Sequence, residues 1–182
     1  MDALEAIRKR RSVRAYKPDP VPPGTLERLV DAAIQAPSAV NSQPWHFTII
    51  CNQSLLDRIS HAAKSHALRT IVAAGPMRDQ FKDSKFQIFY HAPALILISS
   101  RNGDWASESS ALAAENLMLA ACAEGLGTCW IGFAQRWLET EEGKRAVGLP
   151  DGYRPVAPII VGVPSGALDP IPREPAKIHW LD

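Results

Sequence analysis

The spacing of hydrophobic residues predicts a chain in which helices and strands alternate. Between Thr25 and Pro37 the apolar residues recur three and four positions apart, as on the buried face of a helix: Leu26, Leu29, Val30, Ala33 and Ile34. An earlier helix is expected to begin at Asp2, with Glu5 as its capping-box partner. The proline-rich segment KPDPVPPG, residues 17–24, excludes a helix interior and separates these two helices.

Four short apolar segments have the length and the β-branched composition of strands. They lie at residues 46–51, 93–99, 128–133 and 156–163. The second of them, PALILIS, is apolar without interruption, which is typical of a central strand buried on both faces. Together these segments predict a small mixed sheet.

Three further helices are predicted between the strands. One follows Ser54, which is expected to be its N-cap, and a short charged helix is expected at residues 140–147. The longest, residues 107–124, is apolar on nearly all sides and is expected in the core or in an interface. Residues 75–90 lack a clear period and are expected to form a helical turn and a loop.

The composition agrees with a single α+β domain that spans residues 1–182. Of the 182 residues, 46% are hydrophobic and 21% are charged, which is ordinary for a globular protein and excludes a largely disordered chain. The C-terminal tail is too apolar to remain in water, so we expect it to dock on this chain or on a second copy: Ile171, Ile178, Trp180 and Leu181.

Charge and cysteine content exclude several classes of protein. The 20 basic and 19 acidic residues nearly cancel, so bulk electrostatics favour neither nucleic acid nor an anionic membrane as a partner. The three cysteines are far apart and lack metal-binding spacing, so neither a disulfide framework nor a metal site is expected. The chain shows no secretory leader and no membrane-spanning stretch, and the expected location is the cytoplasm.

Three polar stretches are candidates for a binding site. In RRSVR, an extended backbone would point Arg10, Ser12 and Arg14 to one side, where they offer two guanidinium groups and a hydroxyl to an anion; the alternative is a solvated basic helix end. PSAVNSQPW, residues 37–45, is either a ligand-binding loop or a turn that satisfies its own backbone. The third stretch, PREPAKIHW, contains Arg173, which alone would be an ordinary solvated arginine.

Motifs of other enzyme classes are missing from the sequence. GLG at residues 125–127 follows a helix and precedes a strand, which is the reverse of a dinucleotide-binding fingerprint. The chain has no P-loop, no G-x-S-x-G and no H-E-x-x-H, and its five histidines are dispersed. Taken singly, Trp45 and Trp130 are more typical of core aromatics than of ligand contacts. Hydrolase and metalloenzyme chemistry therefore lack a starting residue.

Taken in order along the chain, these stretches resemble the FMN-dependent nitroreductase family. The resemblance covers nearly the full length, through RRSVR, APSAVNSQPWHF, AAENLMLAACAEGLGTCWIG and PREPAKIHW. It implies an α+β nitroreductase-like fold, with a small, mixed and mainly antiparallel sheet flanked by helices, in an intertwined homodimer. Each FMN would lie at the interface and contact both chains, and NADH or NADPH would donate hydride.

The resemblance also implies the residues that bind the cofactor. Arg10, Arg11, Ser12 and Arg14 would hold the flavin, with Arg10 and Ser12 at its phosphate and Arg14 at the pyrimidine edge of its ring. The partner's loop would reach over the flavin through Pro37, Ser38, Ala39, Asn41 and Gln43. Ile131 and Gly132 match the segment at flavin N5, and Arg173 matches a phosphate-binding arginine. No side-chain nucleophile is expected, because the flavin carries the chemistry.

The chain departs from the family pattern at three points. Ile171 stands where some members have a phosphate-binding lysine, and Ile131 stands where many have an acidic residue. The chain also lacks the sequence for the extra helices that wall the substrate pocket in many members. Neither Lys82 nor Lys85 aligns with the polar residue that often contacts the flavin ring.

The activity implied by the resemblance is a ping-pong hydride transfer from NAD(P)H to a small electron-poor acceptor, such as a nitroaromatic compound or a quinone. Two alternatives remain open at this point. One is a flavin-destroying or dehalogenating member of the family, although this chain has little sequence from which to build the lid of those enzymes. The other is a flavin-binding redox protein without a substrate of its own.

Overall fold

The computed structural model of the chain describes residues 1–70, 75–166 and 168–181. Its elements, in chain order, are α1 (Ala3–Lys9), α2 (Pro23–Ala33), the 3-10 turn η1 (Ala39–Asn41), β1 (Trp45–Ile50), α3 (Gln53–Thr70), α4 (Pro76–Lys82), β2 (Ala94–Arg101), α5 (Ala106–Ala123), β3 (Gly127–Trp130), α6 (Gly132–Leu138), α7 (Glu141–Ala146) and β4 (Tyr153–Gly162). The α+β class is therefore confirmed.

The sheet has the strand order β1-β2-β4-β3, and each pair of neighbours is antiparallel. β2 is one of its two central strands and is buried along its whole length except at Arg101. The four strands thus form an antiparallel sheet, and an isolated parallel bridge joins Ser12 to Thr128 on the outer side of β3. The prediction of a buried central strand at residues 93–99 is confirmed.

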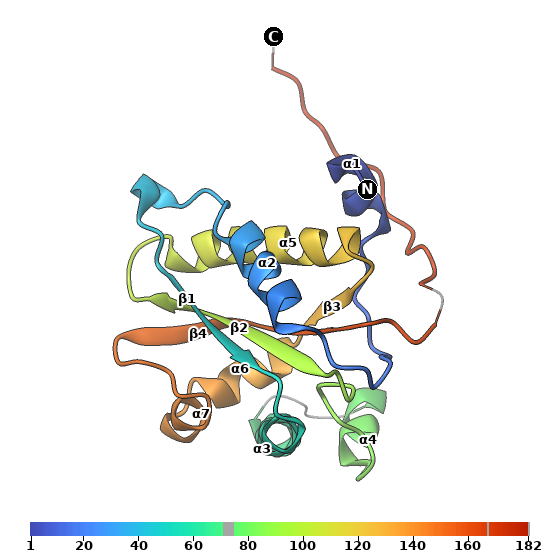
Figure 1. The fold of residues 1–182 in the computed structure, drawn as a ribbon, viewed down its shortest axis with the longest axis vertical. Helices are drawn as coiled ribbons and strands as arrows, with labels where there is room; N and C mark the ends of the chain where they lie inside the picture. Colours follow the sequence, from blue (N-terminus) through green and yellow to red (C-terminus); the bar gives the residue numbers. More distant parts are fainter. Residues whose placement is uncertain (71–74, 167, 182) are drawn as a thin grey trace.

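Helices cover both faces of the sheet, as Figure 1 shows. Side chains of β2 alternate between two hydrophobic clusters, because successive residues of a strand point to opposite faces. Leu95 and Leu97 pack with α3 and α6 on one face, whereas Ile96 and Ile98 pack with α2 and α5 on the other. α1 lies against the outer side of α5, away from the sheet.

Two predicted boundaries are wrong, the start of α3 and the end of β3. The N-cap of α3 is Asn52, whose side chain accepts a hydrogen bond of 2.9 Å from the amide of Leu55; Ser54 lies inside the helix. Asn is as good an N-cap residue as Ser, so the sequence before Leu55 allows the helix to begin after Asn52 or after Ser54. The strand predicted at residues 128–133 ends at Trp130, because α6 begins at Gly132. The short α6 is missing from the prediction.

The start of α1 agrees with the prediction in part. The carboxylate of Asp2 accepts a hydrogen bond of 2.8 Å from the amide of Glu5, as an N-cap does. The side chain of Glu5 turns away from the cap, however, and pairs with Lys9 at 2.6 Å. Only half of the predicted capping box is therefore formed.

The C-terminal tail runs as an extended chain past α1 and away from the body of the molecule (Figure 1). Trp180 is 79% exposed and Leu181 is 88% exposed. The tail thus leaves its apolar residues uncovered by its own chain, and docking on a second copy is the alternative that remains. None of the helices in the described residues is long and apolar enough to span a membrane.

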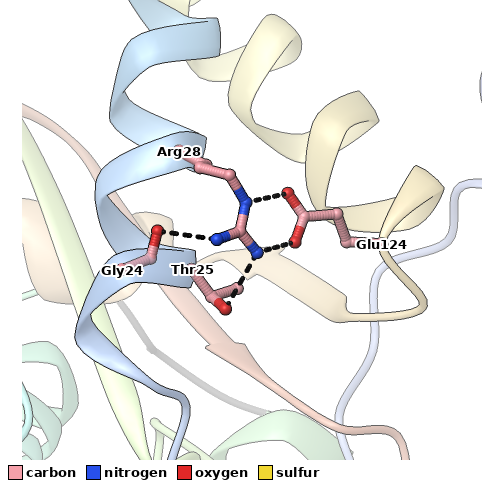
Figure 2. A network of polar contacts seen from close by, with 4 residues as sticks. All are labelled: Gly24, Thr25, Arg28 and Glu124. Carbon is pink, nitrogen blue, oxygen red and sulfur yellow. Dashed lines mark hydrogen bonds and ion pairs between the residues drawn. The ribbon is translucent and has the colours of Figure 1, made fainter.

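A bidentate ion pair joins α2 to the C-terminal end of α5 (Figure 2). The Nε and Nη2 atoms of Arg28 donate to the two carboxylate oxygens of Glu124, at 3.2 and 2.6 Å. Arg28 also donates to the carbonyl of Gly24 and to the hydroxyl of Thr25, both at 3.1 Å. Two of these hydrogen bonds join α2 to Glu124 at the end of α5, and the other two hold the guanidinium against the first turn of α2.

Close packing holds the N-terminal segment beside β3. The amide of Val13 donates to the carbonyl of Thr128 at 2.9 Å, and the Val13 side chain is only 2% exposed. A Cβ atom at Gly127 would lie 2.5 Å from Cγ2 of Val13, far inside the distance that real contacts allow. Gly127 is therefore required for residues 12–14 to lie along the strand.

The first prediction concerns this contact. Gly127→Ala is expected to lower the free energy of unfolding by about 1–3 kcal/mol, the usual cost of overpacking, in urea denaturation. Gly24→Ala is the control, because a Cβ there meets nothing within 4 Å. Val13→Ala makes room for the new methyl group, so the double variant should lose less than the two single losses combined. A Gly127→Ala protein as stable as the control would contradict this interpretation.

The second prediction concerns the Arg28–Glu124 pair. The hydrogen bond from Arg28 lowers the pKa of Glu124, so folding stabilises the charged carboxylate. That stabilisation is complete above the unfolded pKa, about 4.3, and is lost as the pH falls through the lower folded value. Glu124→Gln should therefore lower the thermal midpoint near neutral pH, and its difference from the unmodified protein should vanish as the pH falls below the lowered folded pKa.

Glu139→Gln is a suitable control for the pH series, because Glu139 is exposed and forms no ion pair within the described chain. A difference between Glu124→Gln and the unmodified protein that stays constant across the same pH range would show that the ion pair is not its cause.

Candidate functional site

A cavity of about 610 Å³ opens between α4, the segment that follows it, and the junction of β3 with α6. Its volume lies within the range of small-molecule sites. Arg14 lies at its edge, and Trp130, Ile131 and Gly132 line it from the β3–α6 junction. The cavity thus joins the first candidate stretch to the segment predicted to face flavin N5.

Aromatic rings form one wall of the cavity and hold each other in place. The ring of Phe81 lies 5.2 Å from that of Phe86 and 5.0 Å from that of Phe133, with tilted and edge-on geometries. Phe86 in turn meets Tyr90 edge-on at 5.6 Å. These are favourable arrangements for aromatic pairs, so the cavity has a firm apolar wall.

The stretch RRSVR is extended beyond Arg10, as one of the two sequence interpretations required. α1 ends at Lys9, and the buried Val13 lies between the exposed Ser12 and Arg14, which is the alternation of a strand. The Nε atom of Arg10 is buried without a hydrogen bond, and the nearest carboxylate, that of Glu115, is 3.4 Å away. Glu115 forms an ion pair with Arg10 but accepts no hydrogen bond from its Nε atom, so this donor is left for a further hydrogen-bond acceptor.

Arg11 is oriented differently from its neighbours. Its Nη1 atom donates to the carbonyls of Arg8 and Arg10, both at 2.7 Å, and its Nε atom donates to the carbonyl of Asp169 at 3.2 Å. These bonds close the C-terminal end of α1 and attach the start of the tail. In this arrangement Arg11 has fewer free donors for a ligand than Arg10 or Arg14.

Two ionisable groups in the cavity are kept neutral. Burial raises the pKa of the Cys129 thiol, and the nearby charge of Arg14 offsets only part of this. Burial likewise raises the pKa of Tyr90, against the same opposing charge. A thiol with a raised pKa stays protonated near neutral pH and is a poor nucleophile. The cavity therefore offers binding and positioning groups rather than a nucleophile.

Tyr90 stands where two cavities meet. It lines the main cavity and also an adjoining one of about 310 Å³, as do Arg14 and Phe86. Tyr90 and His91 both have left-handed backbone angles, with φ of 51° and 54°. Such conformations are strained in residues other than glycine and are frequent at functional sites. Lys85 lines the adjoining cavity, whereas Lys82 lines neither of the two.

The polar loop at residues 37–43 lies at the other end of α5 from β3 (Figure 1). Pro37, Ser38 and Ala39 line a separate hollow of about 240 Å³ against the N-terminal half of α5. Some polar groups of the loop form hydrogen bonds with each other. The backbone amide of Gln43 donates to Ser38 Oγ at 3.0 Å, and the side-chain amide of Gln43 donates to Asn41 Oδ1 at 3.1 Å. A single chain therefore does not bring the loop to the cavity beside Arg14.

The loop is nevertheless strained in a way that its own chain does not explain. Val40, Asn41 and Gln43 have positive φ angles of 47°, 55° and 43°. Val40 is β-branched, a poor choice for a left-handed backbone, and it is 99% exposed. The Val40 side chain therefore contributes almost no packing within its own chain to this conformation.

The remaining candidates are divided between the cavity and the surface. The amide of Ile131 donates to the carbonyl of Pro158 at 2.8 Å, whereas Gly132 is exposed at the start of α6, where amides have no partner within the helix. Trp45 packs against the hydrophobic cluster on the α2 and α5 side of the sheet. Arg173 is exposed in the tail.

Sequence reasoning missed two parts of the cavity. The ring wall comes from residues 81–90, where aromatic residues have no regular spacing. Arg136 lies on α6, the helix that was not predicted. The accumulation of Phe81, Phe86 and Tyr90 beside charged residues was the available signal for the wall. No described group of three or more His, Cys, Asp or Glu residues is arranged to hold a metal ion.

Comparisons with known proteins agree with this geometry. The model of the nitroreductase family matches residues 7–163. The chain is 31% identical to a Methanothermobacter thermautotrophicus protein named "Putative NADH dehydrogenase/NAD(P)H nitroreductase", over 98% of this chain and 86% of that protein. It is 28% identical to an NADH dehydrogenase of Thermus thermophilus, over 97% of this chain and 94% of that protein.

A solved structure extends the likeness to the whole fold. The crystal structure of a Bacteroides fragilis nitroreductase with bound FMN superposes with a TM-score of 0.87 at 27% identity, covering 100% of both chains. The family model spans most of the chain, and the strands, the helices and the cavity between them follow the same fold. The chain belongs to the nitroreductase family.

Proposed function

We propose that the protein is an FMN-dependent oxidoreductase that transfers hydride from NADH or NADPH to a small electron-poor acceptor, such as a nitroaromatic compound or a quinone. The observation that carries this proposal is the cavity itself, where Arg14 and the β3–α6 junction meet an aromatic wall in a chain of the nitroreductase family. The similar Bacteroides fragilis nitroreductase binds FMN.

The residues present fit FMN, which combines a phosphate with a planar ring system. The buried Nε atom of Arg10 lacks a hydrogen bond, and the hydroxyl of Ser12 lies two residues along the same extended segment. These two residues would hold the phosphate, with Arg173 of the tail as a further cation. Arg14 would lie at the pyrimidine edge of the ring, and the apolar cavity would accept its planar body.

When bound, FMN supplies an acceptor for two electrons, and the chain's own residues supply positions and charge. As a fixed cation, Arg14 would stabilise negative charge at the pyrimidine edge. The amide of Gly132, at the start of α6, is available to donate a hydrogen bond into the cavity. The aromatic wall excludes water and offers flat faces to planar reactants. Because the nucleotide that donates hydride and the substrate that accepts it would occupy the same cavity, we infer a ping-pong order.

A homodimer is part of this proposal. Leu4 and Ile7 of α1 are 62% and 54% exposed, and Leu112 of α5 is 48% exposed, so apolar side chains face water on the outer layer of the molecule. The side chain of Val40 and the apolar side chains of the tail are also exposed within their own chain. A second copy would cover these surfaces and would bring its polar loop, with Ser38 and Asn41, to the flavin.

The direct test is a visible absorption spectrum of the purified protein, without oxygen, before and after NADH or NADPH is added. We expect a flavin spectrum that bleaches with one or both nucleotides and recovers when a nitroaromatic compound or a quinone is added. If the flavin spectrum recovers with the acceptor when no free nucleotide is left in the solution, this would support the ping-pong order. A protein that stays colourless after incubation with FMN would contradict the proposal.

The phosphate contacts predict a loss of affinity for the cofactor. Arg10→Ala and Arg173→Ala are each expected to weaken FMN binding by about 1.5–3 kcal/mol, the usual contribution of a charge-assisted hydrogen bond. Fluorescence titration of the flavin-free protein measures this loss. Arg145→Ala is a matched control, because Arg145 is an exposed arginine of α7 that lines none of the cavities described above. Unchanged affinity in both tested variants would refute the phosphate assignment.

A further inference from the structure

Arg136 faces the cavity from α6 but has no role in the account so far. Gly132, Phe133 and Arg136 all line the cavity, since residues three and four positions apart lie on one face of a helix. Arg136 therefore lies one helical turn beyond Gly132, at the exposed side of the same cavity. This position is suited to contact with a molecule that enters from solvent.

The guanidinium of Arg136 has no ion pair and no hydrogen bond within the part of the chain that the structure describes. Some other arginines differ from it in this respect. Arg28 is held by Glu124 and Arg10 lies beside Glu115. The donors of Arg136 are thus free to bind a ligand.

The charge of the cavity strengthens this observation. Arg14 and Arg136 both line it, and no aspartate or glutamate of the described residues does so. Two cations next to apolar walls produce a positive potential, because such walls focus the field into the cavity. In the proposed function Arg14 serves the cofactor, so the charge of Arg136 is left for the substrate.

We propose that Arg136 is the specificity-determining residue of this site, and that it binds an anionic group of the planar substrate that enters the cavity beside the flavin ring. The aromatic wall would take the flat, apolar part of that molecule, and the guanidinium would take a carboxylate or phosphate at its outer end. The favoured substrates are therefore aromatic compounds that carry a negative charge. This inference rests on the proposed function and names the substrate class of the same site.

The test compares a charged acceptor with a neutral acceptor of the same shape. The FMN-loaded protein is assayed with 4-nitrobenzoate and with 4-nitrobenzamide, as the unmodified chain and as Arg136→Gln, Arg136→Lys and Arg145→Gln. Arg136→Gln should lower kcat/KM for 4-nitrobenzoate about tenfold, mainly through KM, because the lost ion pair is partly exposed to solvent. Its kcat/KM for 4-nitrobenzamide should change by less than about twofold.

Two controls separate charge from other effects of the substitution. Arg136→Lys keeps a cation and should retain part of the preference for 4-nitrobenzoate, whereas Arg145→Gln, on α7 outside the cavity, should retain all of it. Added salt should reduce the preference of the unmodified protein, because it screens an exposed charge pair.

The anionic group can belong to the acceptor or to the nucleotide, and a second series of donors distinguishes these sources. NADPH and NADH are compared with 1-benzyl-1,4-dihydronicotinamide, which has no phosphate. A loss in Arg136→Gln that appears only with the phosphate-bearing donors assigns the anion to the nucleotide; a loss that follows the acceptor's carboxylate assigns it there. Equal effects on charged and neutral compounds in both series, or no effect in either, would overturn the inference.

A binding measurement keeps this inference distinct from the proposed function. Calorimetry with benzoate and benzamide, which are not reduced, reports the preference for an anion without turnover. Weaker benzoate binding in Arg136→Gln with unchanged benzamide binding supports the anion site even if no acceptor is reduced. A protein that reduces both nitro compounds but binds benzoate no better than benzamide would overturn the inference and leave the proposed function intact.

Discussion

The contact between Val13 and Gly127 positions the candidate site. Residues 12–14 have no helix or strand of their own, and they stay extended because the amide of Val13 bonds to Thr128 while its side chain fills the space that a Cβ at residue 127 would need. Burial of Val13 turns its neighbours Ser12 and Arg14 outward. The strand that receives this segment leads directly into Ile131 and Gly132. One close backbone approach therefore positions both Arg14 and the β3–α6 junction beside the cavity.

The predicted site is divided between two places on the chain, because the loop at residues 37–43 does not lie beside the cavity. The loop at residues 37–43 begins beyond α2 and is held against the opposite end of α5, partly through the hydrogen bond from the amide of Ala39 to Ser109. α5 is long and straight in Figure 1, so it keeps the loop and the cavity apart. In the proposed homodimer, a second copy would cover the exposed Val40 and the apolar residues of the tail. In this account the fold supplies two half-sites, and dimerisation joins them.

Sequence predicted best where local pattern and tertiary environment agree. β2 contains an uninterrupted apolar run, and it is buried on both faces as predicted. The extended geometry of residues 10–14 was one of two open interpretations, because its cause, the contact with Gly127, joins residues far apart in the chain. α6 escaped prediction, since its seven residues follow a strand and begin with Gly132 and Phe133, which carry no helix start signal. The aromatic wall and Arg136 were missed because neither has a periodic signature and the cavity exists only after folding.

In the proposed dimer, Arg14 of one chain and Asn41 of the other serve the same flavin, and a mixed dimer of two variants distinguishes this arrangement from a site formed by one chain. Two differently tagged chains, one carrying Arg14→Ala and the other Asn41→Ala, are refolded together, and the heterodimer is isolated through both tags and titrated with FMN. The account predicts one site per heterodimer with unmodified affinity, because each chain contributes its intact residue to that site, and a second site that lacks both. Two weakened sites, one lacking only Arg14 and the other lacking only Asn41, as expected if each chain formed its site alone, would contradict it.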